Sequence, residues 1–466
     1  MKIDVFLKAD FYSKYILLFA LITCFLYGYI AYFTVRSEFY QLILLSTFAF
    51  LFTYILIEDS QLKFNQLLIL ALIYRLIFLV ATPNLSQDFF RFFWDGQLVL
   101  QGINPYVENV NYYFDNNLTH LISNASELRS GMGELNASHY SNYPPMSQFI
   151  YAVSAWFAKD SIYGFIIALR LILISFDLLF VFFAKKILVV LQKEPKVLFW
   201  YILNPLCILE ITGNLHLEGI MIALFIMGFY FLIKYKYIWS ALFLSLSITT
   251  KLMSLIFIPI LITHLFVKLK NPTHLKTISA YGFWLILFLC VQFAFFYNPT
   301  FINNFSETLS LWFGKFEFNA SIYYVIRWIG YQTVGWNIIQ TYGHYMPIAF
   351  VIIYLVLIFK MKTSPTKMLE FFMWMLIIYY LLSTTVHPWY ILFPLALSVF
   401  TKYNFVYIWS LLILTSYYAY TFPQVEESIF FLTLEYVTVL LYMTYEIIKR
   451  NKSDYLDNFS LNKKPK

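Results

Sequence analysis

Apolar runs long enough to cross a lipid bilayer follow one another along most of the chain, and they limit the fold more than any other feature. A transmembrane helix needs about 20 predominantly apolar residues. The predicted spans, several shorter than this, lie at 15–34, 39–57, 66–83, 161–184, 197–211, 217–233, 237–250, 252–267, 277–297, 346–360, 367–384, 388–401, 403–421 and 429–448. The pattern predicts an all-α, polytopic transmembrane helix bundle of about 13–14 spans.

Composition supports a membrane protein and argues against a nucleic-acid-binding one. The chain is 61% hydrophobic and 12% charged, whereas soluble proteins carry about 25% charged residues. The net charge of +7 comes from short clusters between apolar runs, which is typical of membrane topology. Cys24, Cys207 and Cys290 all lie inside apolar runs, so we expect neither a disulfide framework nor a cysteine-based metal site.

Lysine positions predict which loops face the cytoplasm, because cytoplasmic loops collect Lys and Arg. Segment 84–158 contains no lysine but carries several acidic residues, beginning with Asp88. We therefore expect it to face outward, together with a second large loop at 298–345, and both termini to be cytoplasmic. This layout requires 145–157 to be a helix on the outer surface rather than a crossing, and Tyr143-Pro144-Pro145 marks its start.

The run from Gln87 to Gly96 is the most informative stretch for function. Helical spacing places Asp88, Arg91 and Asp95 on one face and aromatic residues on the remainder. This predicts a helix at the membrane surface with its polar stripe toward water. It is either a simple interfacial helix with an internal Asp–Arg pair, or a helix holding a carboxylate at a cavity mouth, where burial raises its pKa for general-base work.

Further polar residues are predicted on the same side as Asp88. Asn204-Pro205 breaks the fifth span, and His216 and Glu218 follow it. Polar groups beside apolar runs are costly in lipid, so we expect them to face a cavity. His216 with Glu218 provides too few ligands for a favoured zinc site. Lys251 is either an interfacial residue or a cation for a phosphate, and His387 is either structural or part of the same site.

Two charged residues lie near the middle of their spans at matching depths. We predict that Arg75 and Asp177 form an ion pair between the third and fourth spans. Arg170 is on the same helix face as Asp177 and nearer the outer side, where its guanidinium could meet a lipid phosphate.

Taken in order, these motifs resemble those of the membrane-embedded GT-C glycosyltransferases. They are Ser86-Gln87-Asp88 with Arg91, Trp94-Asp95-Gly96, Gly102-Ile103-Asn104-Pro105-Tyr106, Tyr143-Pro144-Pro145, Asn204-Pro205, Asn214-Leu215-His216-Leu217-Glu218, Thr250-Lys251-Leu252 and His387-Pro388-Trp389-Tyr390. The resemblance is to bacterial polyprenyl-phosphate-mannose-dependent mannosyltransferases and, more distantly, to the catalytic subunits of GPI mannosyltransferases. It covers about residues 66–400.

The resemblance implies a transferase that moves a sugar, mannose by likeness, with inversion from a polyprenyl-phosphate donor to an extracytoplasmic glycan or glycolipid. It implies Asp88 as general base and, as substrate-binding or donor-binding residues, Arg91, Asp95, Tyr143, His216, Glu218, Lys251 and His387. Arg170 is added to the donor-binding residues from its position near the outer side. Lys251 is assigned to the donor phosphate. No cofactor and no metal are expected, and Gln87, where many relatives have an acidic residue, weakens a metal-binding version of this loop.

The resemblance also divides the chain. Residues 1–60 are an added transmembrane hairpin, 61–450 form the catalytic membrane domain, with outer loops at about 84–160 and 298–345, and 451–466 are a cytoplasmic tail expected to be disordered. We expect a multi-pass protein of a bacterial cell membrane, in contact with membrane lipids and with its active site facing outward.

The main alternative is a flippase or transporter for polyprenyl-linked sugars that has no transferase activity. Transporters are commonly built from paired repeats with broken helices near the midplane of both halves. Here the polar residues gather on one face beside a long loop, which favours catalysis. A membrane scaffold, the second alternative, needs no cluster of carboxylate, histidine and lysine.

Overall fold

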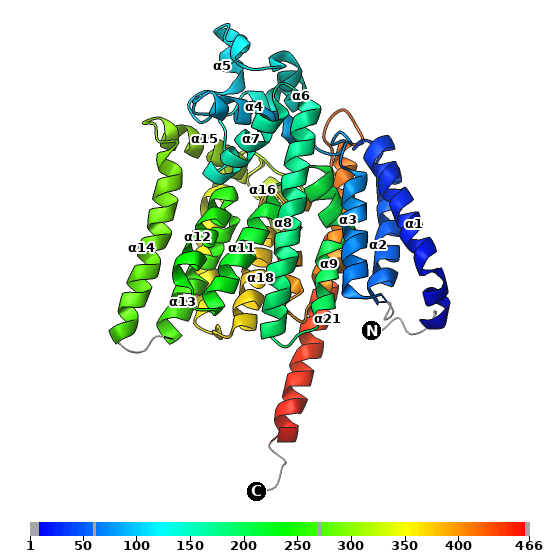
Figure 1. The fold of residues 1–466 in the computed structure, drawn as a ribbon. Coiled ribbons are helices and arrows are strands. Elements are labelled where there is room, and N and C mark those ends of the chain that lie inside the picture. Colours follow the sequence, from blue (N-terminus) through cyan, green and yellow to red (C-terminus); the bar gives the residue numbers. More distant parts are fainter. Residues whose placement is uncertain (1–8, 59–61, 269–271, 462–466) are drawn as a thin grey trace.

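The chain folds into a bundle of helices with a cap of shorter helices at one end (Figure 1). The computed structural model describes residues 9–58, 62–268 and 272–461. The first half contains α1 (Ala9–Phe33), α2 (Phe39–Glu58), α3 (Phe64–Ile77), α4 (Asp88–Leu100), α5 (Val110–Asp115), η1 (Thr119–Leu121), α6 (Ala125–Ala137), α7 (Pro145–Ala158), α8 (Ile162–Val190), η2 (Pro195–Leu198), α9 (Phe199–Ile202), α10 (Pro205–Cys207), η3 (Ile208–Gly213), α11 (Glu218–Ile233) and α12 (Tyr237–Thr250). The second half contains η4 (Leu252–Phe257), α13 (Ile258–Lys268), α14 (Pro272–Ala294), α15 (Phe301–Gly314), α16 (Ile322–Thr333), α17 (Ile339–Ile358), α18 (Pro365–Leu382), η5 (Pro388–Ile391), α19 (Leu392–Ser398), α20 (Phe405–Leu412), η6 (Ile413–Tyr420) and α21 (Ile429–Leu461).

The predicted polytopic helical class is confirmed. Among the described residues, seven helices are long and apolar enough to cross a membrane: α1, α2, α8, α14, α17, α18 and α21. An eighth crossing is available if η2–α9 and α10–η3 act as one bent span. The six other predicted spans coincide with shorter apolar helices of 10–17 residues, so their crossing of the membrane stays a prediction.

The fifth predicted span is broken at Asn204-Pro205, where its two halves meet at 55°. The Asn204 side chain accepts a hydrogen bond from the backbone N–H of Leu206 (2.9 Å), and Pro205 occupies the first helical position, where a missing N–H does no harm. The second half ends in the π-helical turn η3. Leu215 follows with φ +65°, a strained conformation for a leucine, and redirects the chain to bring His216 and Glu218 inward.

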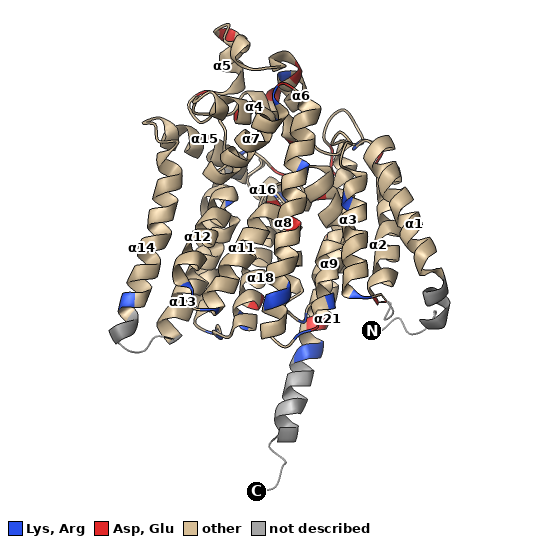
Figure 2. Cartoon of the chain, in the orientation of Figure 1, with Lys and Arg blue, Asp and Glu red and all other residues tan. Residues whose placement is uncertain are grey.

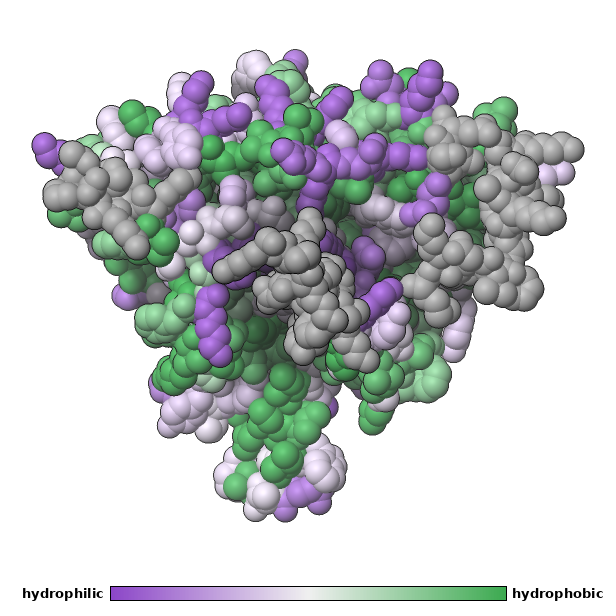
Figure 3. All heavy atoms as spheres, turned by 90° about the horizontal axis from the view of Figure 1, so that it is seen from below, coloured by the Kyte–Doolittle hydropathy of each residue, from purple (hydrophilic) through white to green (hydrophobic). Residues whose placement is uncertain are grey.

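Lysine and arginine gather toward the lower end of the bundle, on α8, α14 and α21, where acidic residues are also present (Figure 2). At the upper end, α5 carries acidic residues and α6 carries residues of both signs. The lower face shows hydrophilic side chains among the apolar ones (Figure 3). The lysine-rich turns and the Asp88 segment thus lie at opposite ends, as predicted; which end faces the cytoplasm stays a prediction.

The short helix predicted after Tyr143 is confirmed as α7. It lies in the cap and packs against α4 and α8 (Figure 1). Gly96 permits the close crossing of α4 and α7, because a Cβ at this position would lie 2.5 Å from the Tyr151 carbonyl oxygen. The surface helix α7 thereby fixes the position of α4, which begins at Asp88.

At the C-terminal end, helix α21 extends to Leu461 and so includes residues 451–461 of the predicted tail. The expected disorder of this tail stays a prediction. Residues 462–466 of the predicted tail lie outside the described residues.

The predicted ion pair inside the bundle is confirmed. Arg75 Nε of α3 lies 2.6 Å from Asp177 Oδ2 of α8, and both side chains are buried. Arg75 also donates a hydrogen bond to the carbonyl oxygen of Ile202 (2.8 Å), just before the break in the fifth span. One side chain thus joins three segments of the bundle.

Candidate active site

A cavity of about 920 Å3 opens at the capped end of the bundle. Its lining includes six of the nine site residues predicted from sequence: Asp88, Arg91, Tyr143, Glu218, Lys251 and His387. The predicted grouping of residues from distant spans at one face therefore corresponds to a real cavity.

Asp88 stands between this cavity and a buried histidine. Its Oδ2 lies 3.7 Å from Nε2 of His216, and its side chain is 26% exposed. His216 is held from the other side, because its Nδ1 lies 3.1 Å from Oε2 of Glu210 and its ring packs on Trp389. His216 thus supports Asp88 from behind rather than lining the cavity itself.

The charges of this pair follow from their surroundings. Burial alone would raise the pKa of Asp88, but the contact with His216 and the charge of Lys251 hold it below its ordinary value. Burial works against the charged form of His216, yet its contacts with Asp88 and Glu210 raise its pKa to about 9. The expectation of a raised pKa for Asp88 is therefore wrong, because the contact with His216 favours the charged form of each side chain.

Four of the lining residues each carry a buried polar atom that has no hydrogen-bond partner among the described residues. These atoms are Nε2 of His139, Oε2 of Glu218, Nε1 of Trp312 and Nδ1 of His387. The His387 ring is stacked between Trp389 and Phe318, and burial lowers its pKa to about 3, so it is neutral. Buried polar groups normally have hydrogen-bond partners, so the hydrogen-bonding capacity of these atoms is unused in this structure.

Lys251 is already paired inside the protein. Its Nζ contacts Oε1 of Glu218, which comes from the first turn of α11, whereas Lys251 ends α12. The carboxylate of Glu218 partly neutralises the charge of Lys251, which weakens the case for its predicted role at a phosphate.

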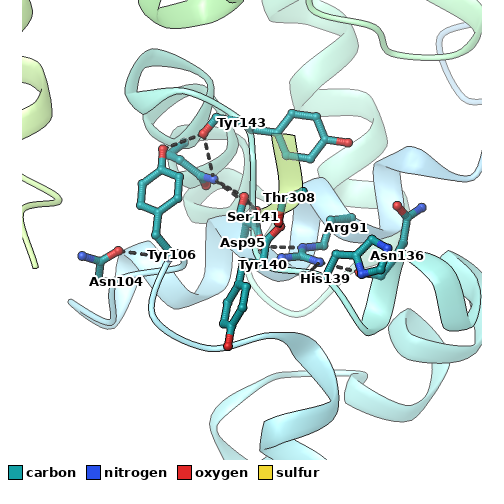
Figure 4. A network of polar contacts seen from close by, with 11 residues as sticks. Arg91, Asp95, Asn104, Tyr106, Asn136, His139, Tyr140, Ser141, Tyr143 and Thr308 are labelled. Carbon is teal, nitrogen blue, oxygen red and sulfur yellow. Dashed lines mark hydrogen bonds and ion pairs between the residues drawn. The ribbon is translucent and has the colours of Figure 1, made fainter. Parts of the chain in front are cut away.

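The predicted water-facing stripe of α4 meets the cavity at Asp88, but Arg91 and Asp95 are buried in a polar network (Figure 4). Asp95 is 0% exposed and accepts hydrogen bonds from Arg91 Nε (2.8 Å), Ser141 Oγ (2.5 Å) and Gln148 Nε2 (3.1 Å). Arg91 also donates to the carbonyl oxygens of Asn136 (2.6 Å) and His139 (3.0 Å). Helical spacing identified the correct face of α4, but segment 136–148, not water, covers it.

This network gives Asp95 a positioning role. Segment 136–144 forms a wall of the cavity, and Asp95 holds it against α4 through Ser141 and Arg91. Tyr143 lies on the same wall, and its carbonyl oxygen accepts a hydrogen bond from the Tyr106 hydroxyl (2.5 Å) (Figure 4). Asp95 itself is not a lining residue.

Arg170 is also absent from the cavity lining. Its guanidinium is fully buried and donates to the carbonyl oxygens of Leu79, Ala81, Thr212 and Gly213. A lipid phosphate is therefore not its partner in this structure; it ties α8 to the segment before α4 and to the end of η3.

Several lining residues were missed by the sequence analysis. Arg36, from the turn between α1 and α2, is the most informative, and others come from the loop around Phe318 and from η6. The sequence offers one indication for Arg36: it is a cation in a turn that is predicted to face outward, on the same side as Asp88. Within the described ranges, no group of three or more His, Cys, Asp or Glu side chains is arranged to hold a metal ion.

Comparisons with known proteins give one match. A family model described as "Alpha-(1->6)-mannopyranosyltransferase, N-terminal domain" matches residues 28–267, slightly more than half of the chain. The matched range runs from the end of α1 into α13 and contains Asp88, His216, Glu218 and Lys251, whereas His387 lies beyond it. Neither the curated proteins nor the solved structures gave a match.

Proposed function

Because the chain belongs to the family of alpha-(1->6)-mannopyranosyltransferases and is therefore a mannosyltransferase, we propose that its donor is a polyprenyl-phosphate-linked mannose. We further propose that the acceptor is a glycan or glycolipid outside the cytoplasm and that Asp88 is the general base. The observation that carries this proposal is the position of the Asp88 carboxyl group, which is partly exposed at a cavity at one end of the helical bundle. A lipid-borne donor can reach such a cavity from the bilayer.

The proposed reaction is a single displacement with inversion at the mannose anomeric carbon. An acceptor hydroxyl loses its proton to Asp88 while its oxygen attacks that carbon. The bond from this carbon to the phosphate oxygen breaks on the opposite side, and the polyprenyl phosphate leaves with the bonding electron pair. The lowered pKa of Asp88 keeps it deprotonated before the reaction.

The neighbouring groups have separate proposed roles. His216 holds the Asp88 carboxylate in position, and Asp95 and Arg91 hold the wall that includes Tyr143. Glu218 and His387, which line the cavity, contact the sugar. The proposed reaction uses no metal and no cofactor.

The donor class can be tested with membranes that contain the protein. We expect them to transfer labelled mannose from polyprenyl-phosphate mannose and not from a nucleotide-linked mannose, because only the former partitions into the bilayer. Membranes without the protein serve as control. Transfer from the nucleotide sugar alone, with all lipid-linked mannose removed, would show that the proposed donor is wrong.

A pH experiment tests the link between His216 and Asp88. Burial raises the pKa of Asp88 and the contact with His216 opposes it, so His216→Gln is expected to raise that pKa. The base must be deprotonated to work, so the acidic limb of the kcat/KM profile should move to higher pH. His120→Gln, an exposed histidine in the same outer segment, should leave the profile in place. An unmoved acidic limb in His216→Gln would contradict the assignment.

A further inference from the structure

One cation at the cavity has no carboxylate partner. Four cationic side chains line the cavity: Arg36, Arg91, Lys251 and Arg327. Three of them form ion pairs, Arg91 with Asp95, Lys251 with Glu218 and Arg327 with Glu317. Arg36 forms no ion pair with any carboxylate in the described part of the chain.

The Arg36 side chain is nevertheless held in place. Its Nη2 donates a hydrogen bond to Oε1 of Gln87 (3.0 Å), and its guanidinium lies over the Tyr420 ring, 4.8 Å from the centroid. Gln87 is itself fixed, because its Nε2 donates to the carbonyl oxygen of Met132 (2.8 Å). The guanidinium is therefore oriented beside the residue that precedes Asp88.

The nearest acidic residue in sequence does not neutralise this cation. Glu38 Oε2 accepts hydrogen bonds from the Val35 backbone N–H (3.1 Å) and from Gln41 Nε2 (3.3 Å), so it stabilises the start of α2. A guanidinium has five N–H donors in a planar fork that matches the oxygens of a phosphate. Stacking on Tyr420 and one bond to Gln87 leave donors of Arg36 for a ligand.

We propose that Arg36 binds the phosphate of the lipid-linked donor, so that the turn between α1 and α2 completes the donor site. This inference rests on the proposed function and changes one part of it, because it transfers the main phosphate contact from Lys251 to Arg36. Lys251 is paired with Glu218, whereas the charge of Arg36 is free to stabilise the negative charge that develops on the leaving phosphate. It also gives the N-terminal hairpin a role in the site.

The test measures binding rather than turnover. Purified protein in phosphatidylcholine nanodiscs is titrated with a polyprenyl phosphate and with the matching polyprenol, which lacks the phosphate. Arg36→Gln is expected to weaken binding of the polyprenyl phosphate by roughly tenfold to a hundredfold, the effect of losing a charge-assisted hydrogen bond, and to leave polyprenol binding unchanged. Arg36→Lys keeps the positive charge but loses the planar set of guanidinium N–H donors. This variant should retain part of the affinity for polyprenyl phosphate.

Arg129→Gln is the matched control, because Arg129 is an arginine of the cap helix α6 that is 37% exposed and is not a lining residue. The inference is overturned if folded Arg36→Gln binds polyprenyl phosphate as the unmodified protein does, or if Lys251→Gln alone causes the loss. It is also overturned if excess phosphatidylglycerol displaces the polyprenyl phosphate, since the site would then take bulk lipid headgroups.

The two proposals fail in different ways. If the unmodified protein transfers mannose from the lipid-linked donor and Arg36→Gln binds polyprenyl phosphate normally, only the role of Arg36 is wrong. If the unmodified protein transfers no mannose from that donor, the proposed function is wrong.

Discussion

Asp88→Asn is expected to remove nearly all mannose transfer while the protein still accumulates in membranes and still binds its donor. Asparagine has nearly the same shape but cannot take a proton from the acceptor hydroxyl. Loss of a general base slows the chemical step by roughly 10²–10⁴-fold. Initial rates of transfer from polyprenyl-phosphate mannose, divided by protein level, give the effect.

The structure indicates why this variant should fold. Asp88 is partly exposed at the cavity, and His216 keeps its second partner, Glu210, at 3.1 Å. Asp115→Asn makes the same change at an exposed position of the cap helix α5 and should leave the rate unaltered. A normal rate in Asp88→Asn would remove Asp88 from the role of base.

Asp177→Ala is expected to destabilise the folded protein strongly. The substitution leaves the Arg75 guanidinium, which is 1% exposed, without its carboxylate, and breaking a buried ion pair in this way costs about 3–5 kcal/mol. We expect a large fall in the midpoint of thermal unfolding in detergent. Replacing both partners with apolar residues, Arg75→Met with Asp177→Leu, should recover part of the loss, because no buried charge is then left unpaired.

The surface pair of Arg129 and Glu134 provides a matched control for that experiment. Its side chains are 37% and 68% exposed, and such pairs contribute about 0–1 kcal/mol. Glu134→Ala should therefore hardly change the unfolding midpoint. Equal stability of Asp177→Ala and Glu134→Ala would mean that the buried pair does not hold α3 to α8.

The helical class, the broken fifth span and the ion pair of Arg75 with Asp177 could all be predicted from the sequence. Each depends on a local or one-dimensional property: apolar length, the missing N–H of Pro205, and matching depth along two spans. The positions of the lysines then predicted which segments lie on the same side of the membrane. This prediction grouped four residues that line one cavity: Asp88, Glu218, Lys251 and His387.

The tertiary contacts of the polar side chains could not be predicted from the sequence. Helical spacing found the polar face of α4, but not that Ser141 and Gln148 cover Asp95. It placed Arg170 near the outer side, but not against four backbone carbonyls. Arg36 was missed because its place beside Gln87 depends on how α1 and α2 pack on the rest of the bundle, which periodicity does not encode.

The most direct test of Asp88 as the base is the single-turnover rate of purified protein that has been loaded with polyprenyl-phosphate mannose before the acceptor is added. This measurement separates the chemical step from donor binding. We expect Asp88→Asn to bind the donor fully and to transfer its mannose roughly 10²–10⁴-fold more slowly than the unmodified protein. Equal single-turnover rates in the two proteins would contradict the assignment of Asp88 as the general base.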